Sequence, residues 1–456
     1  MYTELRAPVQ DILKDAEKKF PYAVASIFSN RGSEINLEKK EERLSSTRSK
    51  FGFVLSIFNG EYFEEFATDK LEKDHITKFC RSAIDEIAVK DNKYKIASDS
   101  CGTKSFKTEE KIDPDSLSIN EKIDIFRQRR ARILAGKKVI NCRIVYSDEL
   151  SSKEIISSKG ILTEELRHIA HYLMVYVSDG SVLKYDYLSV GGTGGFELTS
   201  ISDNEIDQLI ANANRLLDAQ KITPDVYDVV ATPEISGLIA HEAFGHGVET
   251  DMYLKDRARS REYLGKVIAS PLVNIVDDPT LQGGYGSYFI DDEGFQARPT
   301  HIIKKGRFVQ GLTNRYASSV LKLPATANGR RESFARKVYT RMSNTFFEPG
   351  TTKPSEIIES VAHGVYLIKG LSGMEDPKGW GIQVLVLYGK EIRKGKLTER
   401  IFSPLGITGF VPELLSNISS VGDDFKVDLG TCGKGYKEYV PVSSGGPHIK
   451  TRARVG

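Results

Sequence analysis

Two histidines and a glutamate lie within the six-residue segment HEAFGH, residues 241–246. Imidazole nitrogens bind transition metals, and a carboxylate beside a metal can take a proton from water. The spacing is one residue longer than that of the HExxH motif, whose two histidines at i and i+4 share one helix face. On a regular helix, residues five apart are separated by about 500°, which leaves His241 and His246 about 140° apart, too far round to reach one ion.

Gly245 and Gly247 flank His246 and suggest how the extra residue is accommodated. Glycine commonly ends a helix in a left-handed turn, and a π-bulge absorbs one residue at many functional sites. Either feature would turn His246 back beside His241, so that the pair could bind one metal. The alternative for an isolated motif is two packed histidines, each satisfied by a hydrogen bond.

Glu242 follows the first histidine directly and cannot point at the same ion from a helix. It can, however, reach a metal-activated water. Zinc lowers the pKa of such a water to about 7, and a neighbouring carboxylate can take the proton as the water attacks a carbonyl. The motif therefore predicts hydrolysis with Glu242 as the general base.

A catalytic zinc ion normally has three protein ligands, so a third must come from outside the motif. Sequence spacing leaves six candidates open, namely Glu249, Asp251, His301, His363, His448 and Cys432. Cys432 stands between glycines in LGTCGKGY, which predicts a tight loop, and thiolate is a strong zinc ligand. Cys80 falls on a helical pattern and Cys142 on a strand pattern, so both are expected to be small buried side chains.

Two similar units precede the motif, in residues 1–220. The first has a helix over about 4–19, four strand-like runs and a helix over about 74–89; the second repeats this order with helices over about 119–135 and 202–219. Each unit carries a hairpin turn, FNGE at 58–61 and SDGS at 178–181. The pattern predicts an α+β domain built from two helix–four-strand–helix units, with a polar linker at about 91–117.

From residue 221 to 456 glycine-punctuated strands dominate. Residues 301–311 and 384–403 resemble hairpins closed on Lys/Gly turns, and short helices are expected within 354–364 and 411–420. We therefore predict an α+β fold whose second domain, 221–456, is mainly antiparallel β and carries the HExxxH helix.

The chain has 64 Lys and Arg against 62 Asp and Glu, a net charge of +2, so no overall field attracts nucleic acid or an anionic membrane. No apolar run approaches the ~18 residues of a membrane span, and the N-terminus lacks the apolar core of a signal peptide. We expect a cytoplasmic protein with no direct nucleic-acid partner and no membrane partner.

HEAFGHGVETD resembles the signature of the TldD/PmbA family, also called modulators of DNA gyrase, on its TldD-like branch. Further blocks resemble the family in the same order: IDDEG at 290–294, NGRRESFAR at 328–336, RMSNT at 341–345, CGKG at 432–435 and PVSSGGP at 441–447. The sequence departs from the family at YKEYVPV after CGKG, and at GLSGMEDPKGWGIQV, residues 370–384.

The resemblance implies a zinc metallopeptidase acting on peptides or unfolded protein segments, which reach an enclosed site as an extended strand. It implies one zinc ion per chain, with His241, His246 and Cys432 as the ligands and Glu242 as the catalytic glutamate. It also implies a homodimer, or a heterodimer with a PmbA-like paralogue. One thiolate and two imidazoles suit zinc better than magnesium or calcium.

Two other functions compete with this prediction. One is a non-catalytic peptide-binding or regulatory subunit with a structural or vestigial metal site, which would have four protein ligands. The other is a DNA-associated regulator, against which the near-zero net charge and the lack of a DNA-binding motif count. Arg330, Arg331 and Arg336 could grip a phosphate or a carboxylate, but we favour a structural group that pairs with Glu332, Asp291 or Asp292.

Overall fold

The protein is described by a computed structural model over residues 3–97, 102–436 and 438–456, so Cys101 lies outside the described residues. The first unit contains α1 (Thr3–Ala16), β1 (Tyr22–Glu38), β2 (Glu42–Phe58), β3 (Phe63–Thr68) and α2 (Lys73–Glu86). The second contains α3 (Ile119–Leu134), β5 (Val139–Ser157), β6 (Gly160–Ser178), β7 (Leu183–Thr193) and α4 (Asp203–Arg215). The predicted duplication is present, and both predicted hairpin turns connect strands.

The prediction of four strands per unit is wrong, because each unit has three. In each unit the sequence predicts one strand-like run across residues that form a tight turn between two long strands, at 39–41 and at 158–159. Asn30 and its polar neighbours interrupt the strand-like pattern in the sequence but lie within β1, where β2 and β5 pair with them on both sides. The β1–β2 ladder continues past Asn30 through a bulge. The polar linker, for which the sequence predicts no strand, contributes β4 (Lys104–Lys107), which pairs with β6 in parallel.

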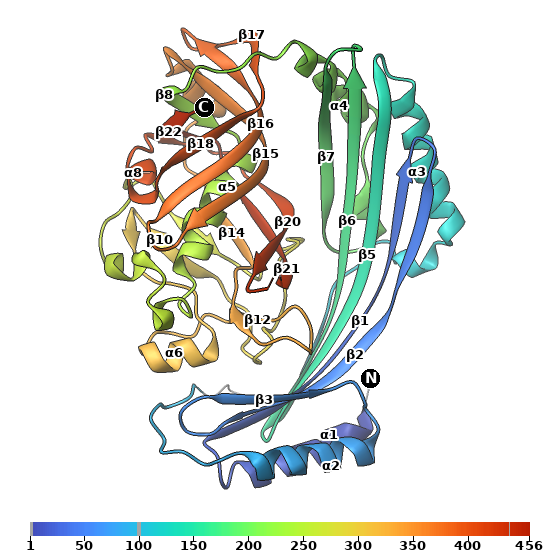
Figure 1. Cartoon of the computed structure of the whole chain (residues 1–456), viewed down its shortest axis with the longest axis vertical. Helices are drawn as coiled ribbons and strands as arrows, with labels where there is room; N and C mark the ends of the chain where they lie inside the picture. The colour runs from blue at the N-terminus through green and yellow to red at the C-terminus, as the bar shows by residue number, and fades with distance from the viewer. Residues whose placement is uncertain (1–2, 98–101, 437) are drawn as a thin grey trace.

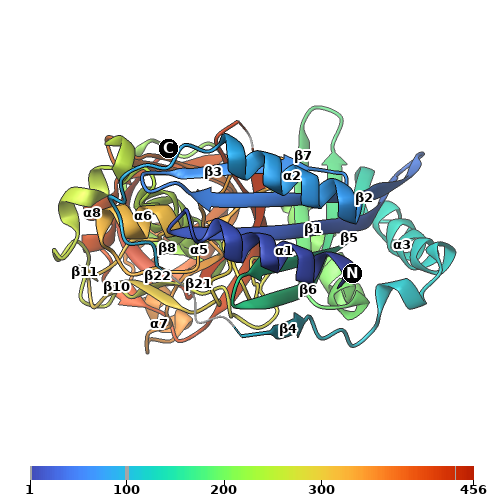
Figure 2. The same cartoon turned by 90° about the horizontal axis from the view of Figure 1, so that it is seen from below.

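The two units share one seven-stranded sheet in the order β3-β2-β1-β5-β6, with β4 and β7 both paired to β6. Its long strands arch beside the C-terminal half of the chain (Figure 1). Helices α1 and α2 lie side by side over one end of the sheet (Figure 2), and α3 and α4 pack on the other end. Capping boxes at Ser118 and Ser202 begin α3 and α4, as these Ser-x-x-Glu sequences dictate.

Two further sheets are built from residues 225–455. One has the order β11-β10-β9-β14-β21-β20. The other has the order β15-β8-β22-β18-β16-β17, with β19 paired to β22 and with β15 also paired to β16. Their strands are β8 (Asp225–Ala231), β9 (Ile275–Asp277), β10 (Thr300–Lys304), β11 (Arg307–Phe308), β14 (Asn344–Phe347), β15 (His363–Asp376), β16 (Gly381–Arg393), β17 (Lys396–Phe402), β18 (Leu405–Phe410), β19 (Ser420–Val421), β20 (Lys426–Lys434), β21 (Glu438–Gly446) and β22 (Ile449–Val455). The small pair β12 (Gly329–Arg330) and β13 (Tyr339–Thr340) stands apart. Most pairings are antiparallel, as predicted, and both predicted hairpins form.

Helix α5 (Pro233–Phe244) lies between these two sheets and contacts β14, β20 and β21 of one and β8, β15 and β16 of the other. Its sequence is apolar on nearly every side, which is typical of a helix enclosed in a core. All residues from Ile235 to Phe244 except Leu238 are buried. The short helices α6 (Arg315–Leu321), α7 (Pro354–Glu359) and α8 (Val411–Ser416) lie outside this core layer, the last two where the sequence predicts them. No helix among the described residues is long and apolar enough to cross a membrane.

Candidate metal centre

The HEAFGH segment changes from an α-helix to a 3-10 helix at its glycine. Helix α5 ends at Phe244, Gly245 has φ −93 and ψ −79, and the 3-10 helix η4 covers His246–Val248. The predicted left-handed turn and the predicted π-bulge are therefore both wrong. Gly245 is needed for another reason: a Cβ at this position would collide with the sulfur of Met342 and with the carbonyl oxygen of His241. Close packing against Met342, rather than handedness, explains the glycine.

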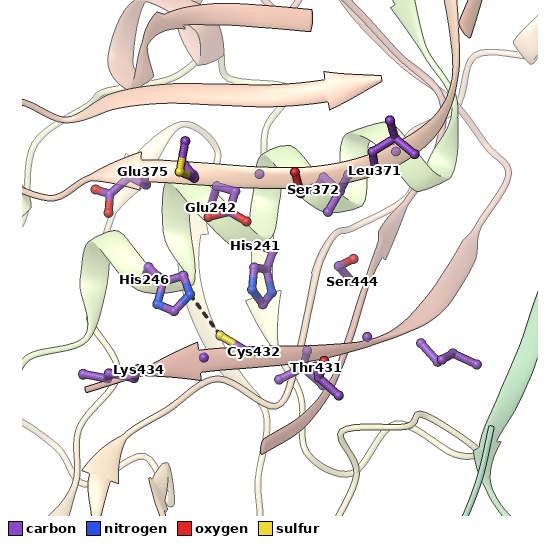
Figure 3. Close-up of a pocket in the computed structure, with 18 of the residues that line it drawn as sticks. His241, Glu242, His246, Leu371, Ser372, Glu375, Thr431, Cys432, Lys434 and Ser444 are labelled. Atoms are coloured by element: carbon purple, nitrogen blue, oxygen red, sulfur yellow. Dashed lines mark hydrogen bonds between the residues drawn. The ribbon is translucent and has the colours of Figure 1, made fainter. Parts of the chain in front are cut away.

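This change of helix type brings the two imidazoles together. The ring centroids of His241 and His246 are 5.4 Å apart and the rings are nearly perpendicular, at 89°. Both rings point toward Cys432 on β20, across the cavity from α5 (Figure 3). Nε2 of His246 lies 2.9 Å from Sγ of Cys432, and ligand atoms of all three residues lie within 4.8 Å of one another. Residues 186 positions apart thus form one cluster.

Cys432 does not lie in a tight loop, contrary to the prediction. It is a buried residue of β20 and pairs with Val440 of β21, and the turn comes later, at Gly435 with φ +63. A strand position holds the thiol more rigidly than a loop would, because ladder hydrogen bonds restrain the backbone on either side of it. Cys80 and Cys142 are fully buried, as predicted.

The other five candidates for a third ligand have different partners. Glu249 and Asp251 accept hydrogen bonds from Nζ of Lys434, at 2.9 and 2.7 Å. His448 pairs with Asp424 at 2.7 Å. His301 lies beside Glu348, and the ring of His363 lies against that of Tyr227. Among the described residues, only Cys432 joins both histidines in a metal-binding cluster.

The electrostatics of the cluster favour an ionised thiol. Burial opposes ionisation of Cys432, but His246 and His241 outweigh it and lower the pKa of the thiol well below its usual range. Burial likewise disfavours protonated imidazoles, yet Cys432 raises the pKa of both, with Glu249 adding to the effect on His246. A thiolate between two imidazoles is a zinc ligand set, and Nδ1 of His241 is buried with no hydrogen-bond partner among the residues that the structure describes. The three residues therefore fit a zinc ion with one coordination position left for substrate or water.

A buried network orients two of the three ligands. Oε2 of Glu249 lies 3.4 Å from Nδ1 of His246 and also accepts the hydrogen bond from Lys434. Arg341, 1% exposed, approaches Oε1 of Glu249 at 3.7 Å and donates from Nη2 to the carbonyl oxygen of Cys432. Burial opposes ionisation of Glu249, but Lys434, His246 and Arg341 lower its pKa to about 2. A carboxylate behind a metal-binding histidine fixes its tautomer and ring orientation.

Glu242 lines the same cavity and is 6% exposed. A Cβ on Gly373 of β15 would collide with its side chain, so this glycine makes room for the carboxylate. Glu375, on the same face of β15 as Gly373, lies near Gly247. Burial raises the pKa of Glu375 to about 8; His246 opposes this, and Glu242 and Glu249 add to it.

The cavity has a volume of about 1200 Å³ and lies between the sheet of the first half and the two later sheets. Strands β6 and β7, helix α5, β15 and β20 all contribute to its walls. The sequence offered no signal for Glu249, Arg341 and Lys434 as a network, because their contacts span up to 185 positions.

The arginine group has protein partners, but among the described residues only Arg336 pairs through its side chain with one of the acids that the sequence suggests. The backbone N–H of Arg331 donates to Asp292, and its guanidinium donates to Glu65 at 2.7 Å. Arg336 lies 3.8 Å from Glu332, while Arg330 donates to the carbonyl oxygen of Met342.

Family comparisons agree with this geometry. Residues 112–220 match the family model described as the PmbA/TldA metallopeptidase central domain, and residues 224–455 match the corresponding C-terminal domain. The chain belongs to the TldD/PmbA family. A metalloprotease from Methanothermobacter thermautotrophicus is 36% identical over 323 residues, which cover 70% of each chain. A protein named zinc metalloprotease TldD homolog, from Saccharolobus solfataricus, is 31% identical over 325 residues, 68% of this chain and 69% of that one.

Solved TldD/PmbA structures share the fold at low identity. A proposed modulator of a DNA gyrase, from Thermotoga maritima, superimposes with a TM-score of 0.80 at 17% identity, covering 98% of this chain and 99% of that one. TldE from Thermococcus kodakarensis gives a TM-score of 0.75, also at 17% identity, with 99% and 100% covered. The predicted TldD/PmbA membership and α+β fold are confirmed.

Proposed function

We propose that this protein is a zinc-dependent metallopeptidase that hydrolyses peptide bonds in peptides or unfolded protein segments. One observation carries the proposal: His241, His246 and Cys432 converge to within 4.8 Å in a cavity that Glu242 also lines. The names of the Methanothermobacter and Saccharolobus relatives support a metalloprotease, and the second supports zinc.

His241, His246 and Cys432 would hold one zinc ion per chain. A zinc ion, when bound, supplies a Lewis acid that polarises a carbonyl and makes water a stronger nucleophile. Glu242 acts as the general base: a carboxylate oxygen accepts the proton of the attacking water and returns it to the leaving nitrogen. Glu249 keeps the ring of His246 oriented, with Lys434 and Arg341 holding Glu249 in place.

Two strands beside the cluster support an extended peptide as the substrate. β20 is the last strand of its sheet, so one of its edges pairs with no strand of the described residues. Among the described strands, β15 pairs with β8 over residues 364–367, and beyond Leu367 it is paired along one edge only, by β16. Residues 370–375 of β15 and 428–434 of β20 both line the cavity. A peptide can add to such edges through main-chain hydrogen bonds, which makes binding tolerant of side-chain sequence.

Dimerisation, with a second copy or a PmbA-like paralogue, stays a prediction, which a measurement of the molecular mass in solution can test.

The test compares wild type with Glu242→Gln on a library of quenched fluorogenic peptides, with zinc content measured for both proteins. We expect about one zinc per chain in each, and a loss of cleavage of at least about 100-fold in the variant, since general-base catalysis contributes 10²–10⁴-fold. Replacing Glu413, an exposed residue of α8, by Gln is the matched control. Full activity of Glu242→Gln would refute the mechanism, and peptide binding without cleavage by wild type would support a non-catalytic binding subunit.

A further inference from the structure

The cavity has a basic end beside the metal ligands. Lys255 and Arg257, at and after the 3-10 helix η5 (Tyr253–Lys255), and Lys337, before β13, all line the cavity. These three side chains come from segments about 80 positions apart and are all exposed. Lys434, which holds Glu249 behind His246, lines the same end.

No ion pair joins Lys255, Arg257 or Lys337 to a carboxylate in the part of the chain that the structure describes. The nearby acids Glu249 and Asp251 accept hydrogen bonds from Lys434 instead. Nζ of Lys337 lies 4.7 Å from the centroid of the Tyr339 ring, which also lines the cavity. Partial burial lowers the pKa of Lys255; Asp251 opposes this, and Lys337, Lys434 and Arg257 lower it further. The cations thus repel one another within one hollow, where an anion would relieve the repulsion.

The opposite end of the cavity is aromatic and apolar. It is formed where β6 and β7 meet α5, β15 and β20, by Tyr172, Met174, Tyr185, Tyr187, Leu238 and Leu371. Its two acids already have partners: Glu234 accepts hydrogen bonds from the hydroxyl of Tyr187 and the N–H of Gly370, and Asp428 pairs with Lys426 at 2.6 Å. Apart from Glu242 and Glu375 beside the metal ligands, the charged side chains of the cavity that have neither an ion pair nor a hydrogen bond among the described residues therefore lie at the basic end.

The metal ligands lie between these two ends. β15 and α5 run in the same direction. In order along both elements, Gly370 lies beside Leu238, Gly373 beside Glu242, and Glu375 beside Gly247 just after α5. Along β20, Leu429 lies against Gly191 of β7, while Lys434 contacts Glu249. Cys432 stands between these two contacts. An extended peptide along β20 would therefore pass from the aromatic end, across the ligands, to the basic end.

We infer that Lys255, Arg257 and Lys337 form a subsite for a carboxylate of the substrate peptide, on the side of the scissile bond that lies toward Lys434. The carboxylate can be an acidic side chain or the free C-terminus, since both present the same pair of oxygens to ammonium and guanidinium donors. This inference rests on the proposed peptidase function and adds a preference for one class of peptides.

The test measures binding to the full-length, zinc-loaded Glu242→Gln protein, so that it does not depend on cleavage. The probes are three N-terminally labelled octapeptides of the same backbone: a neutral peptide with a C-terminal amide, the same peptide with a free C-terminal carboxylate, and the amide with two Gln replaced by Glu. Fluorescence anisotropy gives each Kd in 50 and 300 mM salt. The double substitution Lys255→Gln/Lys337→Gln is compared with Lys304→Gln/Lys396→Gln, two exposed lysines that do not line the cavity.

We expect at least one carboxylate peptide to bind about three- to ten-fold more tightly than the neutral amide, the range for two or three exposed ion pairs. The ratio of the Kd of the neutral amide to that of the carboxylate peptide should fall in 300 mM salt, because exposed ion pairs are screened. The same ratio should approach one in Lys255→Gln/Lys337→Gln and stay unchanged in the control variant Lys304→Gln/Lys396→Gln. Preference for the free acid identifies the C-terminus as the source, and preference for the Glu peptide identifies side chains.

Equal Kd values for all three peptides would overturn the carboxylate subsite and leave the peptidase proposal standing. A preference that survives Lys255→Gln/Lys337→Gln would also overturn it. Failure to bind any peptide would contradict the subsite and the proposed function together.

Discussion

His171 on β6 is a buried histidine that the fold holds neutral. Its side chain is 0% exposed, and its ring lies 4.8 Å from that of Phe126. Nδ1 lies 3.0 Å from the carbonyl oxygen of Val145 and Nε2 lies 2.8 Å from Nη1 of Arg129. Because the carbonyl can only accept and the guanidinium can only donate, both contacts are satisfied only when Nδ1 carries the proton and Nε2 does not. Burial, with Arg129 as a second cause, lowers the pKa of His171 to about 3.

This pKa makes stability depend on pH in a known direction. An unfolded histidine titrates near 6.5, so between pH 6.5 and about 3 the unfolded chain binds a proton that the folded chain does not. The contribution of neutral His171 to stability is therefore fully present above pH 6.5 and is lost as pH falls toward 3. At about 1.36 kcal/mol per pH unit, the 1.5 units from pH 6.5 to about 5 cost roughly 2 kcal/mol.

The assay is guanidinium unfolding of wild type and His171→Gln at pH 7.5 and pH 5.0. Carboxylates contribute to the pH dependence of both proteins, so the difference between the two proteins isolates the histidine. We expect the loss of unfolding free energy between these pH values to be about 2 kcal/mol smaller in the variant. His363→Gln, at an exposed histidine, controls for removal of an imidazole. Identical pH dependence in wild type and His171→Gln would refute the reasoning.

Two further predictions concern the metal centre. Cys432→Ser removes the thiolate, which a hydroxyl replaces poorly as a zinc ligand, so the zinc content should fall well below one ion per chain. Cys142→Ser, at a buried cysteine outside the cluster, is the control and should retain the zinc. Elemental analysis of both proteins, purified without added metal, measures the zinc content. Arg341→Met removes the contact with Glu249 and the hydrogen bond to the carbonyl oxygen of Cys432. Chelator competition should then show that the variant binds zinc about 10- to 100-fold more weakly than wild type. Circular dichroism checks that the variant folds. Unchanged zinc affinity in Arg341→Met would show that the ligands hold their positions without this arginine.

The sequence was most informative where neighbouring residues decide the structure. The Ser-x-x-Glu caps of α3 and α4 and the glycine turns at 58–61 and 178–181 are local features, and all appear where they are expected. The predicted strand lengths in the first sheet were wrong because polar segments such as the one around Asn30 are paired on both sides, by β2 of the same unit and by β5 of the other. Pairing, rather than local composition, keeps these segments in the strand.

By itself, the sequence determined that two histidines and a glutamate would lie at the glycine-marked end of one helix, because these residues are close in the chain and helix geometry acts over a few residues. Only the tertiary structure decided how they are used. Packing against Met342 requires Gly245 and accompanies the 3-10 turn that brings His246 beside His241. Sheet pairing places Cys432, 186 positions away, within 2.9 Å of His246. Contacts across such separations depend on how whole sheets pack around one helix, and no local pattern encodes that arrangement.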